Sequence, residues 1–302
     1  MKGAIQMSKK NRFFGLIIFI IIIFIISSFS SVIGFITDYK WFGELGYIGT
    51  FLTKLKAQFF IGIPLFIVLF FVFSIYLTVL KKKYYKEANI VENKKNDKKI
   101  NLGIKLGSAL ISFFFTVNLV SSLWFKILEF FNAQNFNVSD PIFGNDISFY
   151  IFKLPLISSI LSFLISILVI LMLIAIAFNI FMFISRKPAS NNDTIDFEEF
   201  KRRGMIDPSE FLNKKIITNV IKQVAFLGLL ILVIIGVNLY LKSYDLLYST
   251  RGKVYGASYT DVKISLNVYR IMAIVGIISA ITFFIGAKKK NLRFALTMPV
   301  IL

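Results

Sequence analysis

The chain of 302 residues contains no cysteine and no histidine. These absences exclude disulfide bonds, thiolate nucleophiles and imidazole bases, together with the commonest ligands of zinc, copper and haem. Acid–base or metal chemistry would have to depend on carboxylates, and the chain has only 16 Asp and Glu residues. The sequence therefore predicts no cofactor and no metal site of these kinds, and it does not favour an enzyme.

Long stretches of the chain also lack charge, although 57% of all residues are hydrophobic. A helix needs roughly 20 apolar residues to cross a hydrocarbon core of about 30 Å. Six segments reach that length, and a seventh begins near residue 292: residues 13–35, 57–80, 102–125, 155–184, 218–241 and 268–287. The sequence predicts an all-α, polytopic transmembrane helical bundle with short structured loops, embedded in a lipid bilayer.

The central parts of these spans contain no Asp, Glu, Lys or Arg. The charged residues nearest to them, Lys105, Lys222 and Arg270, lie toward the span ends. Proton relays and ion pathways usually place ionisable groups near the middle of the membrane. This absence argues against a proton-coupled carrier.

Basic residues divide unevenly between alternate connecting segments, in a chain of net charge +19. The segments 1–12, 81–101, 186–217 and 288–293 hold 23 of the 35 Lys and Arg residues, and the segments 36–56, 126–154 and 242–267 hold 9. Because basic loops stay in the cytoplasm, we expect a multi-pass cell-membrane protein whose N-terminus and the first group of segments are cytoplasmic. The second group is then extracytoplasmic. Basic residues beside spans match anionic lipid headgroups, which argues against nucleic acid as the partner.

The basic segment after the second predicted span has low complexity. It reads KKKYYKEANIVENKKNDKK, from Lys81 to Lys99. Such a polar composition is typical of a linker that buries no core and acts only in setting topology.

Polar residues inside the spans are few and follow helical spacing. Asn118, Asn179 and Asn238 are candidates for an intramembrane polar groove. Small residues recur at every fourth position. They form two stripes, Ser108, Ser112 and Thr116 and then Ser158, Ser162 and Ser166, and two pairs, Gly103 with Gly107 and Gly276 with Ala280. Such stripes favour close helix packing. The alternative is a hydrated groove lined by the asparagines and serines.

The three predicted external loops have the most distinctive sequences in the chain. The second loop places turn residues at Asp140-Pro141 and at Gly144-Asn145. The third, from Ser249 to Tyr269, contains glycines and a β-branched alternation that predicts a small hairpin or extended strand.

Six carboxylates lie in these loops: Asp38, Glu44, Asp140, Asp146, Asp245 and Asp261. All but Asp245 form our candidate extracytoplasmic cluster for a hard cation or an amine-bearing envelope substrate, provided that the loops converge. Their spacing matches no recognised cation-binding loop. The alternative interpretation is that they cap helices and pair with Arg251, Lys253 and Lys263.

Three strings in these loops resemble a known family. In order, they are DYKWFGELGY, DPIFGNDISFYIFKLP and GKVYGASYTDV. They look like the uncharacterised bacterial membrane protein family UPF0182, and the resemblance covers essentially the whole chain. It implies about seven N-terminal spans followed by a large extracytoplasmic region, with no established activity. This chain stops at Leu302, inside what would be the seventh span, so it resembles the membrane half.

Three hypotheses of function follow. The first is a cell-envelope scaffold or anchor for an extracytoplasmic module, with envelope or membrane proteins as partners. The second is a transporter or channel for a neutral or lipidic substrate moving along the Ser and Asn groove. The third is an envelope enzyme that uses the extracytoplasmic carboxylates. The sequence indicates neither a substrate nor an oligomeric state.

Overall fold

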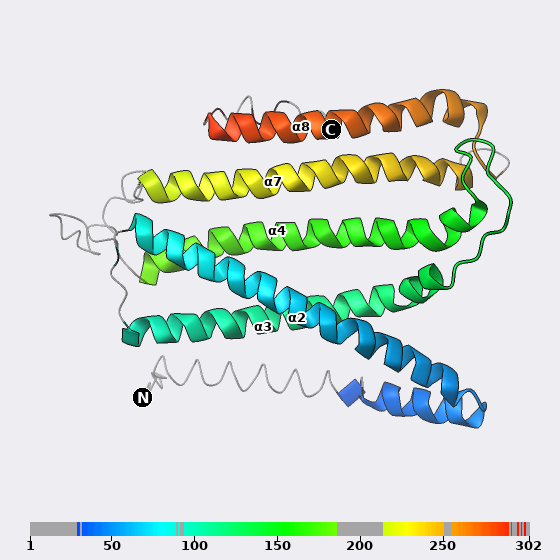
Figure 1. Cartoon of the computed structure of the whole chain (residues 1–302), viewed down its shortest axis with the longest axis horizontal. Helices are drawn as coiled ribbons and strands as arrows, with labels where there is room; N and C mark the ends of the chain where they lie inside the picture. The colour runs from blue at the N-terminus through cyan, green and yellow to red at the C-terminus, as the bar shows by residue number, and fades with distance from the viewer. Residues whose placement is uncertain are drawn as a thin grey trace, which may run out of the picture. The chain divides into compact units, whose positions relative to one another are not determined.

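Figure 1 shows a computed structural model of the chain. It describes residues 29–30, 32–88, 90, 94–185, 214–250 and 255–289, together with residues 291, 295, 297 and 299. The chain divides into two compact units, residues 1–60 and 61–302, and each is described by itself.

Five long helices make up most of the described chain: α2 (Ile48–Glu87), α3 (Lys94–Phe131), α4 (Leu154–Ser185), α7 (Lys214–Lys242) and α8 (Leu266–Lys288). Each is long and apolar enough to cross a membrane. Three short helical turns accompany them: η1 (Phe149–Lys153), η2 (Ser243–Tyr248) and η3 (Asp261–Ser265). The described residues form no strand beyond one isolated bridge, between Ser139 and Asp146. The prediction of an all-helical, multi-pass membrane protein is confirmed at this level.

Five of the predicted spans, from 57–80 to 268–287, each lie inside one of these helices. Most of the predicted first span and the predicted start of the seventh lie outside the described residues, as does most of the loop 186–217. The predicted hairpin or strand in the third loop is wrong where that loop is described, because residues 259–265 are helical.

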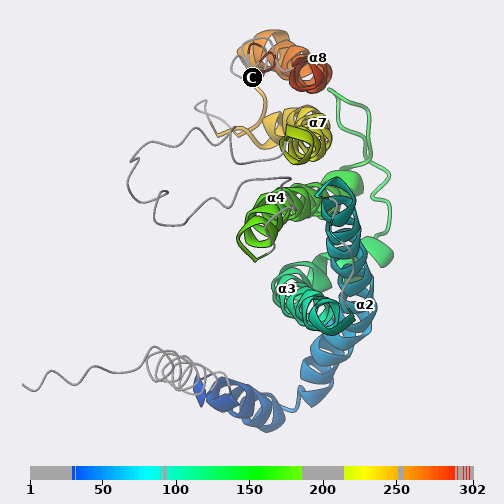
Figure 2. The same ribbon diagram turned by 90° about the vertical axis from the view of Figure 1, so that its left-hand side faces the viewer.

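In the larger unit, α3, α4, α7 and α8 lie side by side in chain order, as Figures 1 and 2 show. The part of α2 after residue 60 packs against α3 and α4. One core cluster joins Leu69 and Phe73 of α2 to Leu171 of α4 and Leu227 of α7. Burying side chains of this size stabilises a packed state by about 1.5–3 kcal/mol each in water, and in lipid the gain comes from close packing.

Helices α7 and α8 lie in close contact at two glycines, Gly236 and Gly276. A Cβ atom on Gly276 would lie 2.8 Å from the Cα atom of Gly236. The predicted close approach at Gly276 is therefore confirmed. The matching prediction for Gly103 and Gly107 is wrong, because a Cβ atom on either would meet nothing within 4 Å.

The helices extend past the predicted spans at the end of the bundle where α2 stops and α3 starts, which we call the lysine end. Helix α2 continues to Glu87 and α3 begins at Lys94. Tyr84, Met182 and Ile216 are buried there in one cluster. The expectation of a coreless linker from Lys81 to Lys99 is therefore wrong. Lys and Glu are good helix formers, and the tyrosines supply the apolar surface that the lysines lack.

The smaller unit contains a helix over residues 32–44 and the start of α2. Its DYKWFGELGY motif forms a tight turn. Gly46 has φ +76°, Tyr47 N–H donates to the Phe42 carbonyl at 2.8 Å, and Gly46 N–H donates to the Gly43 carbonyl at 3.1 Å. This pairing ends a helix at a left-handed glycine. The side chain of Phe51 then packs on Phe42.

Candidate functional site

The second loop, which contains the DPIFGNDISFYIFKLP string and which we call the second motif loop, folds around the carboxylate of Asp140. Its Oδ1 accepts hydrogen bonds from the backbone N–H groups of Ile142 and Phe143, both at 2.8 Å. Its Oδ2 accepts from the N–H of Asn145 at 3.1 Å and from the hydroxyl of Tyr150. The predicted turn at Asp140 is confirmed, and a single buried carboxylate connects the loop to η1, directly before α4.

Asp146 holds the next part of the same loop. Its Oδ1 accepts from the N–H groups of Phe136 at 3.2 Å and Ser148 at 2.8 Å. The side chain and backbone of Ser148 are the main donors that lower the pKa of Asp146 to about 2. Burial raises the pKa of Asp140, but the bonds from Tyr150 and the loop backbone outweigh it, and the net pKa is below its usual value. Both groups are therefore ionised at neutral pH.

Asp261 plays the corresponding part at the start of α8. This buried carboxylate accepts from the N–H of Ser258 at 3.1 Å, the hydroxyl of Ser258 at 2.9 Å and the hydroxyl of Ser265 at 3.3 Å. Local bonds of this kind favour a helix start over a strand, which explains why the hairpin prediction for this loop fails.

Aromatic rings lock the second loop onto α7 and η2. The ring of Tyr244 lies 4.7 Å from that of Phe143, 5.7 Å from those of Phe149 and Tyr150, and 5.9 Å from that of Tyr240, measured between centroids. Edge-to-face packing of this kind fixes ring positions. The second loop and the segment that follows α7 are distant in sequence, yet they therefore form one ordered surface. We call this end of the bundle the loop end.

The candidate carboxylates do not gather into a metal site in the part of the chain that the structure describes, where no group of three or more acidic side chains could hold an ion. Asp140, Asp146 and Asp261 each bond to their own segment. Asp38 and Glu44 are exposed on the helix of the smaller unit. The five-residue ligand cluster stays a prediction.

The intramembrane asparagines lie apart. Asn118 lines a groove of about 430 Å³ with serines of α3 and α4, namely Ser122, Ser158, Ser159, Ser162 and Ser166. Asn179 lies on α4, 13 residues beyond Ser166 and thus about 20 Å farther along the helix. Asn238 is half-buried on α7. The α4 serine stripe therefore lines a groove, whereas Ser108 and Ser112 of α3 are buried.

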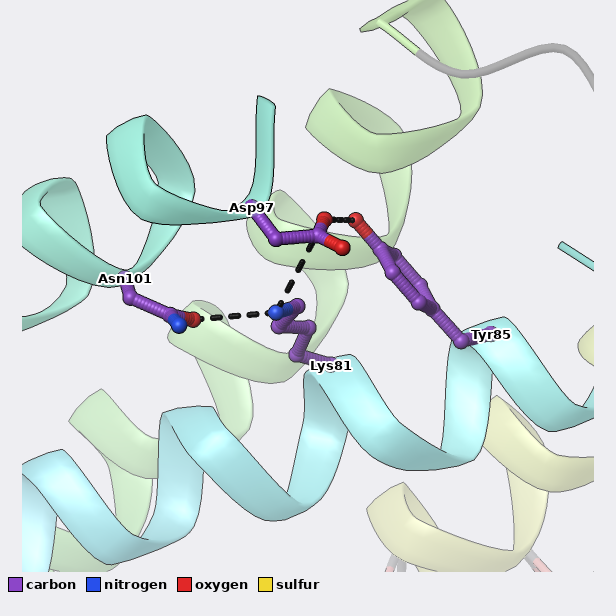
Figure 3. A network of polar contacts seen from close by, with 4 residues as sticks. All are labelled: Lys81, Tyr85, Asp97 and Asn101. Atoms are coloured by element: carbon purple, nitrogen blue, oxygen red, sulfur yellow. Dashed lines mark hydrogen bonds and ion pairs between the residues drawn. The ribbon is translucent and has the colours of Figure 1, made fainter. Parts of the chain in front are cut away.

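A polar network at the lysine end was missed by the sequence analysis (Figure 3). Lys81 of α2 and Asp97 of α3 form a buried ion pair at 3.8 Å, at 4% and 6% exposure. Lys81 also donates to Asn101 Oδ1 at 3.0 Å, and the Tyr85 hydroxyl donates to Asp97 Oδ1 at 2.5 Å. The sequence feature that could have indicated this network is spacing. Lys81 and Tyr85 are four residues apart on one helix, and so are Asp97 and Asn101 on the next.

The model of the uncharacterised protein family UPF0182 matches residues 15–302 of this chain. A UPF0182 protein of Alkaliphilus metalliredigens is 38% identical over 90% of this chain and 28% of its own length. Those of Clostridium perfringens and Clostridium kluyveri are 37% and 35% identical, over 94% and 95% of this chain and 29% and 31% of their own lengths. The chain thus spans less than a third of these relatives. No solved structure matches it.

Proposed function

This chain belongs to the UPF0182 family, and from that premise we propose that its helices anchor and orient an extracytoplasmic module of the cell envelope. In this proposal the loop end faces outward and the lysine end faces the cytoplasm. The relatives are more than three times as long as the matched region, which leaves room for such a module in them.

The uneven distribution of Lys and Arg supports this orientation. Lys81, Lys82, Lys98 and Lys105 cluster at the lysine end, where basic residues would meet the negative surface of the cytoplasmic leaflet. The described membrane helices carry no charged residue in their central parts, as expected for an anchor that moves no ion.

The observation that carries the proposal is the ordered surface at the loop end. Hydrogen bonds to Asp140, Asp146 and Asp261 hold its backbone, yet Tyr255 and Tyr259 remain 86% and 78% exposed. A rigid scaffold that displays exposed tyrosines is suited to binding a partner, because few side chains lose freedom on association.

We expect a photo-crosslinking residue placed at Tyr255 or Tyr259 to capture an envelope component in intact cells. The matched control is the same residue at Phe113, an exposed position in the middle of α3 that would face lipid. Mass spectrometry of the products identifies the captured component. The proposal is wrong if no envelope component is captured and deletion of the gene leaves envelope integrity unchanged.

The orientation is checked in the same cells. Because the chain has no cysteine, each introduced cysteine is unique. An impermeant maleimide should label Val138→Cys and Tyr255→Cys from outside, and Lys82→Cys only after permeabilisation. The opposite pattern would reverse the orientation and remove the support for the anchor.

A second function, the translocation of a neutral or lipidic substrate, is favoured by one observation, the groove of Asn118 and the serines between α3 and α4. In this case Asn118→Leu should slow movement of fluorescent phosphatidylcholine across proteoliposomes by roughly tenfold, because a polar path would be closed by an apolar side chain. Asn179→Leu is the matched control, since Asn179 lies outside the groove. Equal rates for both variants and the wild type would eliminate this function.

A further inference from the structure

The polar network at the lysine end forms part of a larger cavity. The cavity has a volume of about 570 Å³ and lies between the last turns of α2 and the first turns of α3. Its lining residues are Thr78, Lys81, Lys82, Asp97, Lys98, Asn101, Leu102 and Lys105. This volume is in the range of cavities that hold small ligands.

The charges of the described lining residues do not balance. Among them, four lysines share the cavity with one carboxylate, Asp97. Like charges around one cavity repel, and the repulsion is stronger beside apolar protein and lipid than in water. An anion in the cavity would relieve it.

The network holds one of these ammonium groups in place. Lys81 is buried, and its ammonium has three N–H donors. Asn101 accepts one of them, and the nearest oxygen of Asp97 lies at 3.8 Å, longer than a hydrogen bond. The Tyr85 ring, 5.0 Å from this nitrogen, further restricts it. Lys81 is therefore prepositioned toward the cavity, while Lys82, Lys98 and Lys105 are exposed and adjustable.

We propose that this cavity binds the phosphate group of an anionic ligand. Phosphate carries the negative charge and the several acceptor oxygens that a set of ammonium donors and the Asn101 amide would satisfy. The ligand would be either an anionic phospholipid headgroup or a soluble phosphate.

The surroundings favour the lipid. Leu102 lines the cavity and is exposed, and the exposed Leu106 continues this apolar surface one turn farther along α3. Acyl chains would lie along this surface while the headgroup occupies the basic cavity. Basic pockets at the ends of membrane helices recognise lipid headgroups in this way. The inference does not depend on the anchor function, because it concerns the opposite end of the bundle.

The test is binding to the purified full chain in neutral detergent, measured by native mass spectrometry. The probes are phosphatidylglycerol, phosphatidylcholine and inorganic phosphate. We expect phosphatidylglycerol to bind more tightly than phosphatidylcholine. The double variant Lys98→Gln/Lys105→Gln should weaken phosphatidylglycerol binding by roughly 30-fold, since two attractive charges are lost.

The matched control is Lys83→Gln/Lys86→Gln, which removes the same charge from exposed lysines of α2 that do not line the cavity. It should change binding by less than about threefold. Asn101→Asp is a second variant of nearly unchanged shape that adds a negative charge to the cavity and should also weaken binding.

The outcomes separate the two ligand sources. Tight binding of inorganic phosphate that is lost in Lys98→Gln/Lys105→Gln, without selective binding of phosphatidylglycerol, would identify a soluble phosphate. The proposal is overturned if both double variants weaken binding equally, or if neither the double cavity variant nor Asn101→Asp weakens the binding of any probe. Unchanged circular dichroism and gel-filtration profiles establish that the variants are folded.

Discussion

The variant Gly276→Leu should lose roughly 3 kcal/mol or more of its free energy of unfolding, because α8 can no longer pack on α7. Even a Cβ atom at this position would lie 2.8 Å from the Gly236 Cα atom and 3.3 Å from its backbone nitrogen. These are backbone atoms of a helix and cannot move aside as a flexible side chain would. The two helices must separate, and the contacts along their whole interface weaken. Unfolding by sodium dodecyl sulfate in mixed micelles, followed by circular dichroism, measures the loss.

Gly103→Leu is the matched control for this prediction. It makes the same change of residue in a membrane helix, but its Cβ atom meets nothing within 4 Å. It should be neutral or slightly stabilising, because glycine is a poor helix former. Equal unfolding midpoints for Gly276→Leu and Gly103→Leu would mean that the α7–α8 approach is not as close as described.

The variant Asp140→Ala should free the second motif loop, at a cost of about 3 kcal/mol. Removing this carboxylate leaves the N–H groups of Ile142, Phe143 and Asn145 and the Tyr150 hydroxyl without their acceptor. Hydrogen bonds to a charged group are stronger than neutral ones, and buried donors left unsatisfied are costly. Hydrogen–deuterium exchange of the peptide covering residues 138–148 should become at least tenfold faster, while exchange in α8 stays unchanged.

The conservative variant separates charge from shape. Asp140→Asn keeps one acceptor oxygen and should show an intermediate exchange rate. Asp38→Ala, a carboxylate exposed on the smaller unit, should leave exchange in this loop unaffected. Slow exchange in Asp140→Ala would show that the loop is held by the ring of Tyr244 rather than by the carboxylate. If Asp140→Ala also abolished crosslinking at Tyr255, loop order and the proposed anchoring surface would be linked.

The motif loops could be recognised from the sequence because their turn chemistry is local. Asp140-Pro141 and Gly144-Asn145 predict turns within a stretch of six residues, and the structure has a turn there. What each carboxylate does is less local. Asp140 reaches Tyr150, and the rings of Tyr150 and Tyr244 meet although 94 positions separate them in the chain. A pattern of acidic residues alone therefore does not distinguish a ligand-binding site from carboxylates that bond to their own loop.

The lysine end shows the same limit. The composition of residues 81–99 predicts a linker, because the lysines in this segment outnumber its tyrosines, Tyr84 and Tyr85. Those tyrosines become a core only where Met182 of α4 and Ile216 of α7 come to meet them. The serine stripes also differ in surroundings rather than in spacing: Ser112 is buried, and Ser162 lines a groove.

The sequence by itself determined that this protein is helical, crosses the membrane repeatedly and belongs with the UPF0182 proteins, since hydrophobic length and short turn motifs are properties of neighbouring residues. Only the tertiary structure decided which polar groups are satisfied by their own loops and which line a cavity. Partners such as Lys81 and Asp97, or Gly236 and Gly276, come from different helices, and in lipid it is the packing of helices against one another that brings such residues together.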